Sequence, residues 1–459
     1  MAQLKCGLEI HGYINVENKT KLFCNCAIDE NATPNKNICP ICTAMPGSKP
    51  MLPNKEAVDK IIAIALMLGC KLNKRLLFQR KHYSWPDLPA GFQKTISGSY
   101  SFPVGVNGRF LGIGISDVHL EEDPARWDPI TGNVDFNRSG FPLVEIVTEP
   151  DFKSAGQLRE WLKALLTTLS YIKAIDKNSG VKADVNVSIG PLFNRVEIKN
   201  INSFKNIVRA IEYEILRQEK EVSEGRAIKQ QTRAFDEKNN KTVFMRLKEQ
   251  AADYMFIPEP DLPVIKLTEK DIKKIRDKLP EGPDEKIKRF TEKYKIKKED
   301  AFVICSDIML SELFEKTAKK INPMLAARWL RFELLRVLNY NKKELSDTKI
   351  NEKHLIGLLS LIENKKITET TAQKLLEKLA EKPFDVNSYV KKHKLMAIFG
   401  VEELEKLCRN VVKNNNKVVS DYKKGRKEAL NYLVGQVMKA TKGKASPKHV
   451  NEIIKRLVG

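Results

Sequence analysis

Acidic side chains and a histidine gather in three short stretches that lie far apart in the sequence. These stretches are residues 7–11 (GLEIH), 119–123 (HLEED) and 145–151 (EIVTEPD). Valine, isoleucine and leucine separate the acids, which is typical of strands with one buried face. Carboxylates without lysine or arginine beside them need a cation, and Mg²⁺ is the usual ion for oxygen ligands. A Mg²⁺ held by several strands commonly serves a nucleoside triphosphate.

The strand period of two predicts which side chains share a face. Glu9 and His11 lie on one face of the first strand, with apolar neighbours turned toward the core. Glu145 occupies a corresponding position on another strand. A lone glutamate on such a strand is more often an edge or salt-bridge residue. Three strands of this kind favour a common site.

The middle stretch leaves one question open. Alternation pairs His119 with Glu121 on one face of the strand. Glu122 therefore joins the same site only beyond a bulge or the end of the strand.

Basic residues near these stretches are candidates for neutralising phosphate oxygens. Lys81 precedes an aromatic and proline-rich loop, residues 83–93, and Arg126 and Arg138 follow the middle stretch. The sequence contains no P-loop, glycine-rich kinase loop or GxGxxG motif, so a nucleotide site must be built on sheet side chains and metal. No catalytic serine or cysteine signature is visible, which argues against glutamine or ester hydrolysis in this chain.

Four of the eight cysteines lie close together in the sequence, in two pairs. No secretory signal precedes them, so the pairs predict a zinc site rather than disulfides. Four thiolates on two tight turns can surround Zn²⁺ as a closed structural site. The alternative is a set of reduced, buried cysteines. The predicted zinc ligands are Cys24, Cys26, Cys39 and Cys42.

The chain has 459 residues and a net charge of +22. This excess indicates a polyanionic partner such as nucleic acid, or else a lysine-rich surface without a specific partner. The longest apolar run, residues 61–68, is too short to span a bilayer, and the N-terminus lacks a signal pattern. We expect a cytoplasmic protein with no membrane partner.

Composition divides the chain into four parts. Residues 1–265 hold most strand-like runs, including a strand, turn and strand over 133–148, with helices at 155–169 and 206–218. The irregular order of strands and helices predicts an α+β fold with a largely antiparallel sheet. Residues 266–300 form a charged connector, 301–385 a helical domain and 386–459 a helical tail module.

The tail is distinctly basic. From residue 413 to the end it carries twelve basic and three acidic residues. A small helical module with a basic exterior suits contacts to a nucleic-acid backbone. An ordinary lysine-coated helix pair is equally compatible with this segment.

Over nearly its whole length the sequence resembles the B subunits of the tRNA-dependent aspartyl/glutamyl amidotransferases. The resemblance rests on separated motifs that occur in order. They are GLEIH at 7–11, the four cysteines, RK at 80–81 through PDLP at 86–89, HLEED at 119–123, NRSG at 137–140, PLVEIVTEPD at 142–151, DVNVS at 184–188, EIKNINSF at 197–204, and QTR at 231–233.

The resemblance implies a glutamine-synthetase-like cradle that binds ATP and Mg²⁺, followed by helical and tail domains that bind tRNA. It places the metal on His11, Glu122 and Glu145, with Glu9 beside them, and requires the strand to break before Glu122. It implies activation of the side-chain carboxylate of mischarged Asp-tRNA(Asn) or Glu-tRNA(Gln) by phosphorylation. Ammonia then comes from a glutaminase A subunit, and a small C subunit completes a heterotrimer.

Two other interpretations compete with this one. A non-catalytic, zinc-containing RNA-binding protein explains the charge and the cysteines, with the acids forming internal salt bridges. A standalone ligase of the ATP-grasp kind lacks a glycine-rich phosphate loop in this sequence.

Overall fold

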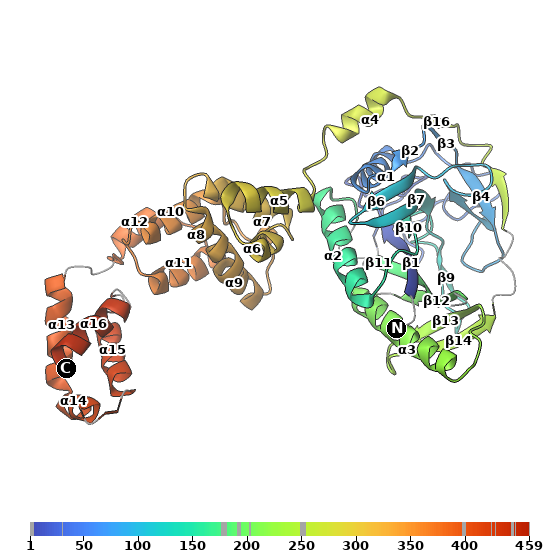
Figure 1. Cartoon of the computed structure of the whole chain (residues 1–459). Helices are drawn as coiled ribbons and strands as arrows, with labels where there is room; N and C mark the ends of the chain where they lie inside the picture. The colour runs from blue at the N-terminus through green and yellow to red at the C-terminus, as the bar shows by residue number, and fades with distance from the viewer. Residues whose placement is uncertain are drawn as a thin grey trace. The chain divides into compact units, whose positions relative to one another are not determined.

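The computed structural model describes residues 4–29, 31–175, 181–190, 194–201, 203–247, 254–396, 401–423, 425–426, 428–441, 445 and 447–458. The chain forms two compact units, Met1–Gly282 and Pro283–Gly459. Strands and helices mix in the first unit, whereas the described part of the second is helical (Figure 1).

A twelve-stranded sheet organises the first unit. Its strand order is β14-β13-β12-β11-β1-β10-β7-β5-β4-β15, with β6 paired to β7 and β2 to β6. Among the described strands, only β12 and β13 run parallel to each other. The strands are β1 (Leu4–Tyr13), β2 (Lys71–Leu72), β4 (Gln79–His82), β5 (Phe92–Thr95), β6 (Gly105–Phe110), β7 (Ile113–Glu122), β10 (Pro142–Thr148), β11 (Val181–Ile189), β12 (Val196–Ile201), β13 (Gln231–Asp236), β14 (Lys241–Leu247) and β15 (Met255–Pro258).

Strand β1 shows how the sheet separates its two faces. Cys6, Leu8 and Ile10 are at most 2% exposed and join the hydrophobic core. Because successive side chains alternate, Glu9 and His11 lie on the opposite face. The sheet therefore has one apolar face and one face that carries charge.

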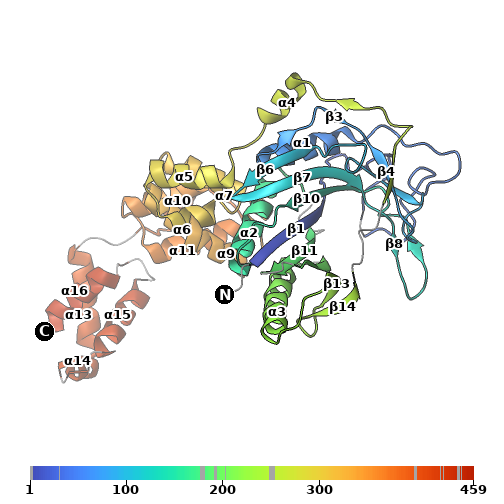
Figure 2. The ribbon, with the colours of Figure 1, turned by 45° about the vertical axis from the view of Figure 1, so that its right-hand side comes forward.

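Three helices contribute to the core on the apolar side. They are α1 (Lys55–Met67), α2 (Ala155–Tyr171) and α3 (Phe204–Ser223), and each begins with a side-chain cap, from Asn54, Ser154 and Ser203 respectively. Such caps satisfy backbone N–H groups that have no partner within the helix. Helices α2 and α3 pack side by side (Figure 2).

Two short ribbons complete the strands of the first unit: β3 (Arg75–Leu76) with β16 (Ile265–Lys266), and β8 (Arg126–Trp127) with β9 (Val134–Asp135). The predicted strand at 133–140 is therefore mostly wrong. Only Val134 and Asp135 are extended, and they pair with β8 rather than with β10. The following side chains instead bond to the cysteine segment.

The second unit contains two hydrophobic cores in its described residues, one between Phe290 and Val390 and one between Leu404 and Val458. Asn322 and Asn351 cap helices, as their sequence context predicts. The elements are α5 (Pro283–Tyr294), α6 (Lys298–Ile304), α7 (Ile308–Ala318), α8 (Pro323–Arg328), the π-helix η1 (Trp329–Leu334), α9 (Leu335–Tyr340), the 3₁₀ turn η2 (Leu345–Asp347), α10 (Glu352–Glu363), α11 (Glu369–Glu381), α12 (Val386–Lys392), α13 (Val401–Asn414), α14 (Asn416–Lys423), α15 (Glu428–Ala440) and α16 (Pro447–Val458).

The α+β class, with a largely antiparallel sheet followed by helices, is confirmed. The boundary between the units lies at Gly282 rather than at residue 265. Helix α4 (Glu269–Arg276) buries Ile272 in the first core, and α5 buries Phe290 in the second. Residues 266–300 are thus divided between two cores, because their charged surfaces conceal buried apolar positions. None of the described helices is both long enough and apolar enough to cross a bilayer.

Candidate active site

Strand register brings the three acidic stretches together on the charged face of the sheet. His11 on β1 lies opposite Glu145 on β10. Glu145 in turn lies opposite His119 on β7, and Leu143 lies opposite Glu121. Directly opposed residues in antiparallel strands share a face. The central strands therefore present these side chains to one common space.

His11, Glu121 and Glu145 form a compact group whose potential ligand atoms all lie within 4.8 Å of one another. Nδ1 of His11 is 3.9 Å from Oε1 of Glu121 and 4.0 Å from Oε2 of Glu145. No lysine or arginine nitrogen from the described part of the chain lies within 4.0 Å of either carboxylate. One imidazole and two carboxylates converge here without a lysine or arginine partner among the described residues.

Glu122 lies elsewhere, so the expected break in the strand is wrong. Strand β7 continues through Glu122, which pairs with Pro142. Its side chain turns to the other face, where Lys94 holds it at 2.8 Å. The irregularity in β7 pairing falls beside Thr148 instead, far from the HLEED motif. Simple alternation already favours Glu121, and the structure places Glu121 in the group.

His119 is a site residue that sequence reasoning named without assigning it a role. Its ring is 7% exposed, and Nδ1 lies 2.8 Å from Oδ1 of Asp117 while Nε2 lies 3.0 Å from Oε2 of Glu145. The even spacing of Asp117, His119 and Glu121 on β7 is the signal that could have found this arrangement. His119 thus holds the Glu145 carboxylate in place through a hydrogen bond at Nε2.

The electrostatics of the group follow from burial and from His119. Burial acts to lower the pKa of His119, but the charge of Glu145 and hydrogen bonds to Asp117 and Glu145 raise it to about 10. Burial acts to raise the pKa of Glu145, but the His119 charge outweighs this and holds it below its usual value. Burial and then the Glu145 charge raise the pKa of Glu121.

A second acidic group borders the first. Potential ligand atoms of Glu9, Asp184 and Glu197 lie within 4.8 Å of one another. Lys199 already supplies a cation here, because its Nζ lies 2.8 Å from Oδ2 of Asp184 and 3.3 Å from Oε1 of Glu197. Asn186 donates to Oε1 of Glu9 at 3.0 Å. The two acidic groups therefore differ in their need for an external ion.

Both groups line a pocket of about 510 Å³. Its walls also carry Lys81, Lys182 and Arg138, together with the rings of Tyr83 and Tyr254. A pocket of this size accommodates a nucleotide-sized ligand. Of the three predicted phosphate-binding cations, Lys81 and Arg138 line the pocket. Arg126 is exposed on β8 and is not among the lining residues.

Arg138 is fixed in the pocket by its neighbours. Its Nε lies 2.8 Å from Oδ2 of Asp123, and Nη2 donates to the carbonyl of Ala125 at 3.0 Å. The Tyr13 hydroxyl donates to the same Asp123 oxygen at 2.6 Å. Burial raises the pKa of Asp123, while the Arg138 charge acts to lower it. One guanidinium is thus held at the rim by a buried carboxylate.

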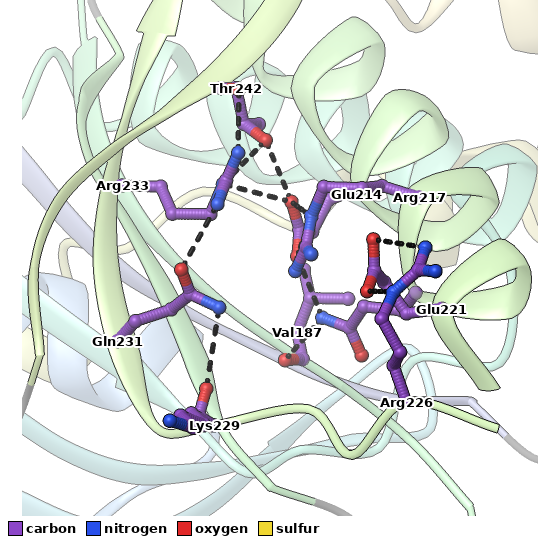
Figure 3. Close-up of polar contacts among 10 residues, drawn as sticks. Val187, Glu214, Arg217, Glu221, Arg226, Lys229, Gln231, Arg233 and Thr242 are labelled. Atoms are coloured by element: carbon purple, nitrogen blue, oxygen red, sulfur yellow. Dashed lines mark hydrogen bonds and ion pairs between the residues drawn. The ribbon is translucent and has the colours of Figure 1, made fainter. Parts of the chain in front are cut away.

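A separate ion cluster locks the outer strands against α3 (Figure 3). The Glu214 carboxylate, which is fully buried, accepts from Nη2 of Arg217 at 2.6 Å and from Oγ1 of Thr242 at 2.8 Å. Arg233 on β13 reaches the same carboxylate at 3.5 Å and donates to Thr242. Its neighbour Thr232 donates to Oε2 of Glu197 at 3.1 Å. Strand β13 thus connects this cluster to the pocket.

The cysteines also meet in space. Sγ atoms of all four lie within 4.8 Å of one another, and those of Cys39 and Cys42 are 3.9 Å apart. Sulfurs about 2.3 Å from a tetrahedral zinc ion lie about 3.8 Å apart, so the spacing fits. Because a Cys24 hydrogen bond outweighs burial, the pKa of Cys42 is lowered to about 4. Sequence reasoning identified the complete set: Cys24, Cys26, Cys39 and Cys42.

Comparisons with known proteins identify the family of this chain. A family model described as the GatB/GatE catalytic domain matches residues 4–273, and one described as the GatB domain matches residues 312–458. The chain is 44% identical to the B subunit of the aspartyl/glutamyl-tRNA(Asn/Gln) amidotransferase of Methanocaldococcus jannaschii, over 99% of this chain and 97% of that protein. It is 43% identical to the B subunit of the same name from Methanothermobacter thermautotrophicus, over 99% of this chain and 100% of that protein.

Proposed function

The chain belongs to the family of aspartyl/glutamyl-tRNA(Asn/Gln) amidotransferase B subunits, and on that premise we propose that its pocket phosphorylates a tRNA-linked carboxylate. ATP supplies the phosphoryl group, and the substrates are Asp-tRNA(Asn) and Glu-tRNA(Gln). The observation that carries this proposal is the group formed by His11, Glu121 and Glu145, where two buried carboxylates lack a lysine or arginine partner among the described residues.

The donor chemistry of this group suits Mg²⁺. Two carboxylates supply hard oxygen ligands and His11 supplies a third ligand, with Glu121 in the role that the resemblance gives to Glu122. When bound, Mg²⁺ offsets negative charge on phosphate oxygens. His119 orients Glu145 for this task, as outer hydrogen bonds commonly orient metal ligands.

The remaining residues position and neutralise the reactants. A carboxylate is a poor electrophile, because its charge repels a nucleophile and oxide is a poor leaving group. An acyl phosphate removes both obstacles, and ammonia then displaces phosphate. Lys81 and Lys182 line the pocket where charge must be neutralised, and Arg138 is held at its rim. Glu9 lies beside the proposed metal ligands and is a candidate for transferring a proton or for binding a cation.

The partners follow from the family resemblance. It implies that ammonia comes from a separate glutaminase A subunit and that a small C subunit completes the complex, and the sequence carries no glutaminase signature of its own. The net charge of +22 and the basic tail suit tRNA. We also propose that Cys24, Cys26, Cys39 and Cys42 bind a structural Zn²⁺.

The competing interpretation, a non-catalytic RNA-binding protein, requires the acids to be satisfied by internal salt bridges. Glu214 meets that requirement through Arg217 and Arg233. Glu121 and Glu145 meet it only in part, since His119 supplies a single positive charge for two carboxylates. The pocket therefore favours catalysis.

The decisive experiment uses the assembled complex. Each mischarged tRNA is offered with glutamine and ATP, and the aminoacyl group is analysed for amide formation. We expect ATP-dependent conversion, with loss of conversion but retained tRNA binding in Glu145→Ala. Equal conversion by wild type and Glu145→Ala contradicts the proposal.

A further inference from the structure

A fully buried lysine lies beside the cysteine cluster. The Lys21 side chain is 1% exposed, and its Nζ donates to Sγ of Cys42 at 3.4 Å and to the carbonyl of Phe136 at 3.2 Å. Within the described ranges, no carboxylate oxygen lies within 4.0 Å of this ammonium. Lysine is almost never fully buried without an opposite charge, because removing an ammonium from water costs several kcal/mol.

The cysteines are the available source of that opposite charge. Four thiolates around a divalent cation carry a net charge of 2−, and Cys42 is one of the two buried members of the set. An N–H donor aimed at its sulfur therefore stabilises the metal-bound form over the metal-free form.

We propose that Lys21 is the buried counter-cation of a tetrathiolate metal centre and a positioning residue that links this centre to the pocket. The proposal rests on the zinc site proposed above and adds a residue outside the four ligands. Its second half concerns the Arg138 turn, defined as residues 135–140, which leads into β10 and Glu145.

The cysteine segment holds the Arg138 turn through several hydrogen bonds. Besides Lys21 to Phe136, the Leu22 amide donates to the carbonyl of Gly140 at 2.7 Å, and Oγ of Ser139 donates to the carbonyl of Cys42 at 2.8 Å. Further along the segment, the Asn37 amide donates to Oδ1 of Asn137 at 2.8 Å, and Nδ2 of Asn137 donates to the carbonyl of Thr33 at 2.7 Å.

The stem of Lys21 adds packing to these bonds. Its ammonium lies 6.0 Å from the centre of the Phe141 ring, and that ring packs edge-on against Tyr13 at 5.7 Å. Tyr13 and Arg138 meet on Asp123 in the pocket. A continuous set of contacts therefore runs from the metal ligands to the guanidinium at the rim.

The test measures zinc affinity in the full chain by competition with a chelator. Lys21→Met keeps the length and apolar stem of the side chain but removes its charge, and we expect zinc affinity to fall about 10- to 100-fold. Lys21→Arg retains the charge and should recover much of this loss. Lys36→Met removes a charge from an exposed position in the same segment and should bind zinc as the wild type does.

Replacing zinc with Co²⁺ gives a spectroscopic measure of the same contact. We expect the sulfur-to-cobalt charge-transfer bands to shift in Lys21→Met and to stay in place in Lys36→Met. A wild-type chain that binds no zinc overturns the metal site itself. A Lys21→Met chain with unchanged zinc affinity and unchanged bands overturns the role of Lys21 alone.

A measurement on the wild type covers the case in which Lys21→Met does not fold. An amine-reactive reagent should spare Lys21 in the zinc-loaded chain and modify it after zinc is removed, as read by peptide mass spectrometry. Lys36 should be modified equally in both states. Equal modification of Lys21 with and without zinc contradicts the proposal.

Discussion

Two groups of acidic side chains in the first unit differ in charge balance, one between α3 and the outer strands and one on the central strands of the sheet. Glu214 is a single carboxylate that meets two guanidinium groups, Gln218 and Thr242. Glu121 and Glu145 are two carboxylates whose close neighbours are two imidazoles, His11 in the pocket and His119 buried beside Glu145. The first cluster is neutralised within the protein, whereas the second leaves capacity for an added cation. Burial of an acid therefore indicates a functional site only where its neighbours leave the charge incompletely compensated.

The largest expected effect falls on stability at the neutralised cluster. Glu214→Ala leaves the partly buried Arg217 and Arg233 without this counter-charge, which should lower the free energy of unfolding by about 3 kcal/mol. Urea unfolding measures this loss. The matched control is Glu221→Ala on the same helix, whose exposed pair with Arg226 should matter much less. Equal losses in the two variants would show that Glu214 is not a structural centre.

The incompletely compensated cluster should respond in the opposite way. Glu121→Gln and Glu145→Gln should reduce ATP-dependent amidation about 100- to 1000-fold, because each removes a charge that places the cation. Glu121→Gln should not lower the free energy of unfolding, since it removes an acid whose pKa burial raises. Glu145→Gln should lower it, because the buried His119 loses its carboxylate partner. Steady-state amidation assays and urea unfolding of the same preparations separate the two effects.

Glu122→Gln is the control that distinguishes neighbouring glutamates. It breaks the pair with Lys94 on the other face of β7 while leaving the pocket face intact. We expect amidation close to wild type. Amidation lost in Glu122→Gln and retained in Glu121→Gln would favour the residue that the family resemblance indicates.

A smaller effect on amidation is expected from substitution of His119, which contacts Glu145 but is not one of the three proposed metal ligands. His119→Asn should lower the apparent affinity for Mg²⁺ about 10- to 100-fold, because Glu145 loses the ring that orients it. Since the ligands remain, kcat should recover at saturating Mg²⁺. Titration of amidation against Mg²⁺ tests this, and a kcat loss that no Mg²⁺ concentration repairs would give His119 a different role.

Much of this arrangement is local in origin and could be read from the sequence. The period of two places Glu9 and His11 on one face, and asparagine side chains begin helices at Asn54 and Asn322. The four cysteines also meet as their spacing predicts. These features depend on neighbouring residues along the chain, so sequence patterns report them.

Other features depend on contacts between distant segments. The local pattern predicts a strand and turn over residues 133–140, yet Asn137 and Ser139 bond to the cysteine segment about 100 residues earlier. Lys21 and Glu214 look like ordinary surface charges in the sequence, because nothing local indicates that they are buried. The placement of Glu121 beside His11 and Glu145 needs only alternation, whereas the family resemblance indicates the next residue, Glu122.

The smallest expected effect concerns pH and again separates the two clusters. Burial and Glu145 raise the pKa of Glu121 above its usual value near 4.5, so the folded state binds this proton more tightly than the unfolded state. Its contribution to stability is therefore present at low pH and is lost as pH rises through the folded pKa. Without Mg²⁺, wild type should lose stability relative to Glu121→Gln as the pH rises above the usual pKa of this carboxyl.

Urea unfolding of both chains at a series of pH values, in buffer without divalent cations, measures the difference. Saturating Mg²⁺ should flatten it, because the ion compensates the ionised carboxylate of Glu121 in the folded state alone. The same comparison for Glu221→Ala should show no Mg²⁺ effect, because Arg226 already neutralises that acid. If the difference in free energy of unfolding between wild type and Glu121→Gln changed with neither pH nor Mg²⁺, the charge of Glu121 would be compensated within the protein. The distinction between the two clusters would then disappear.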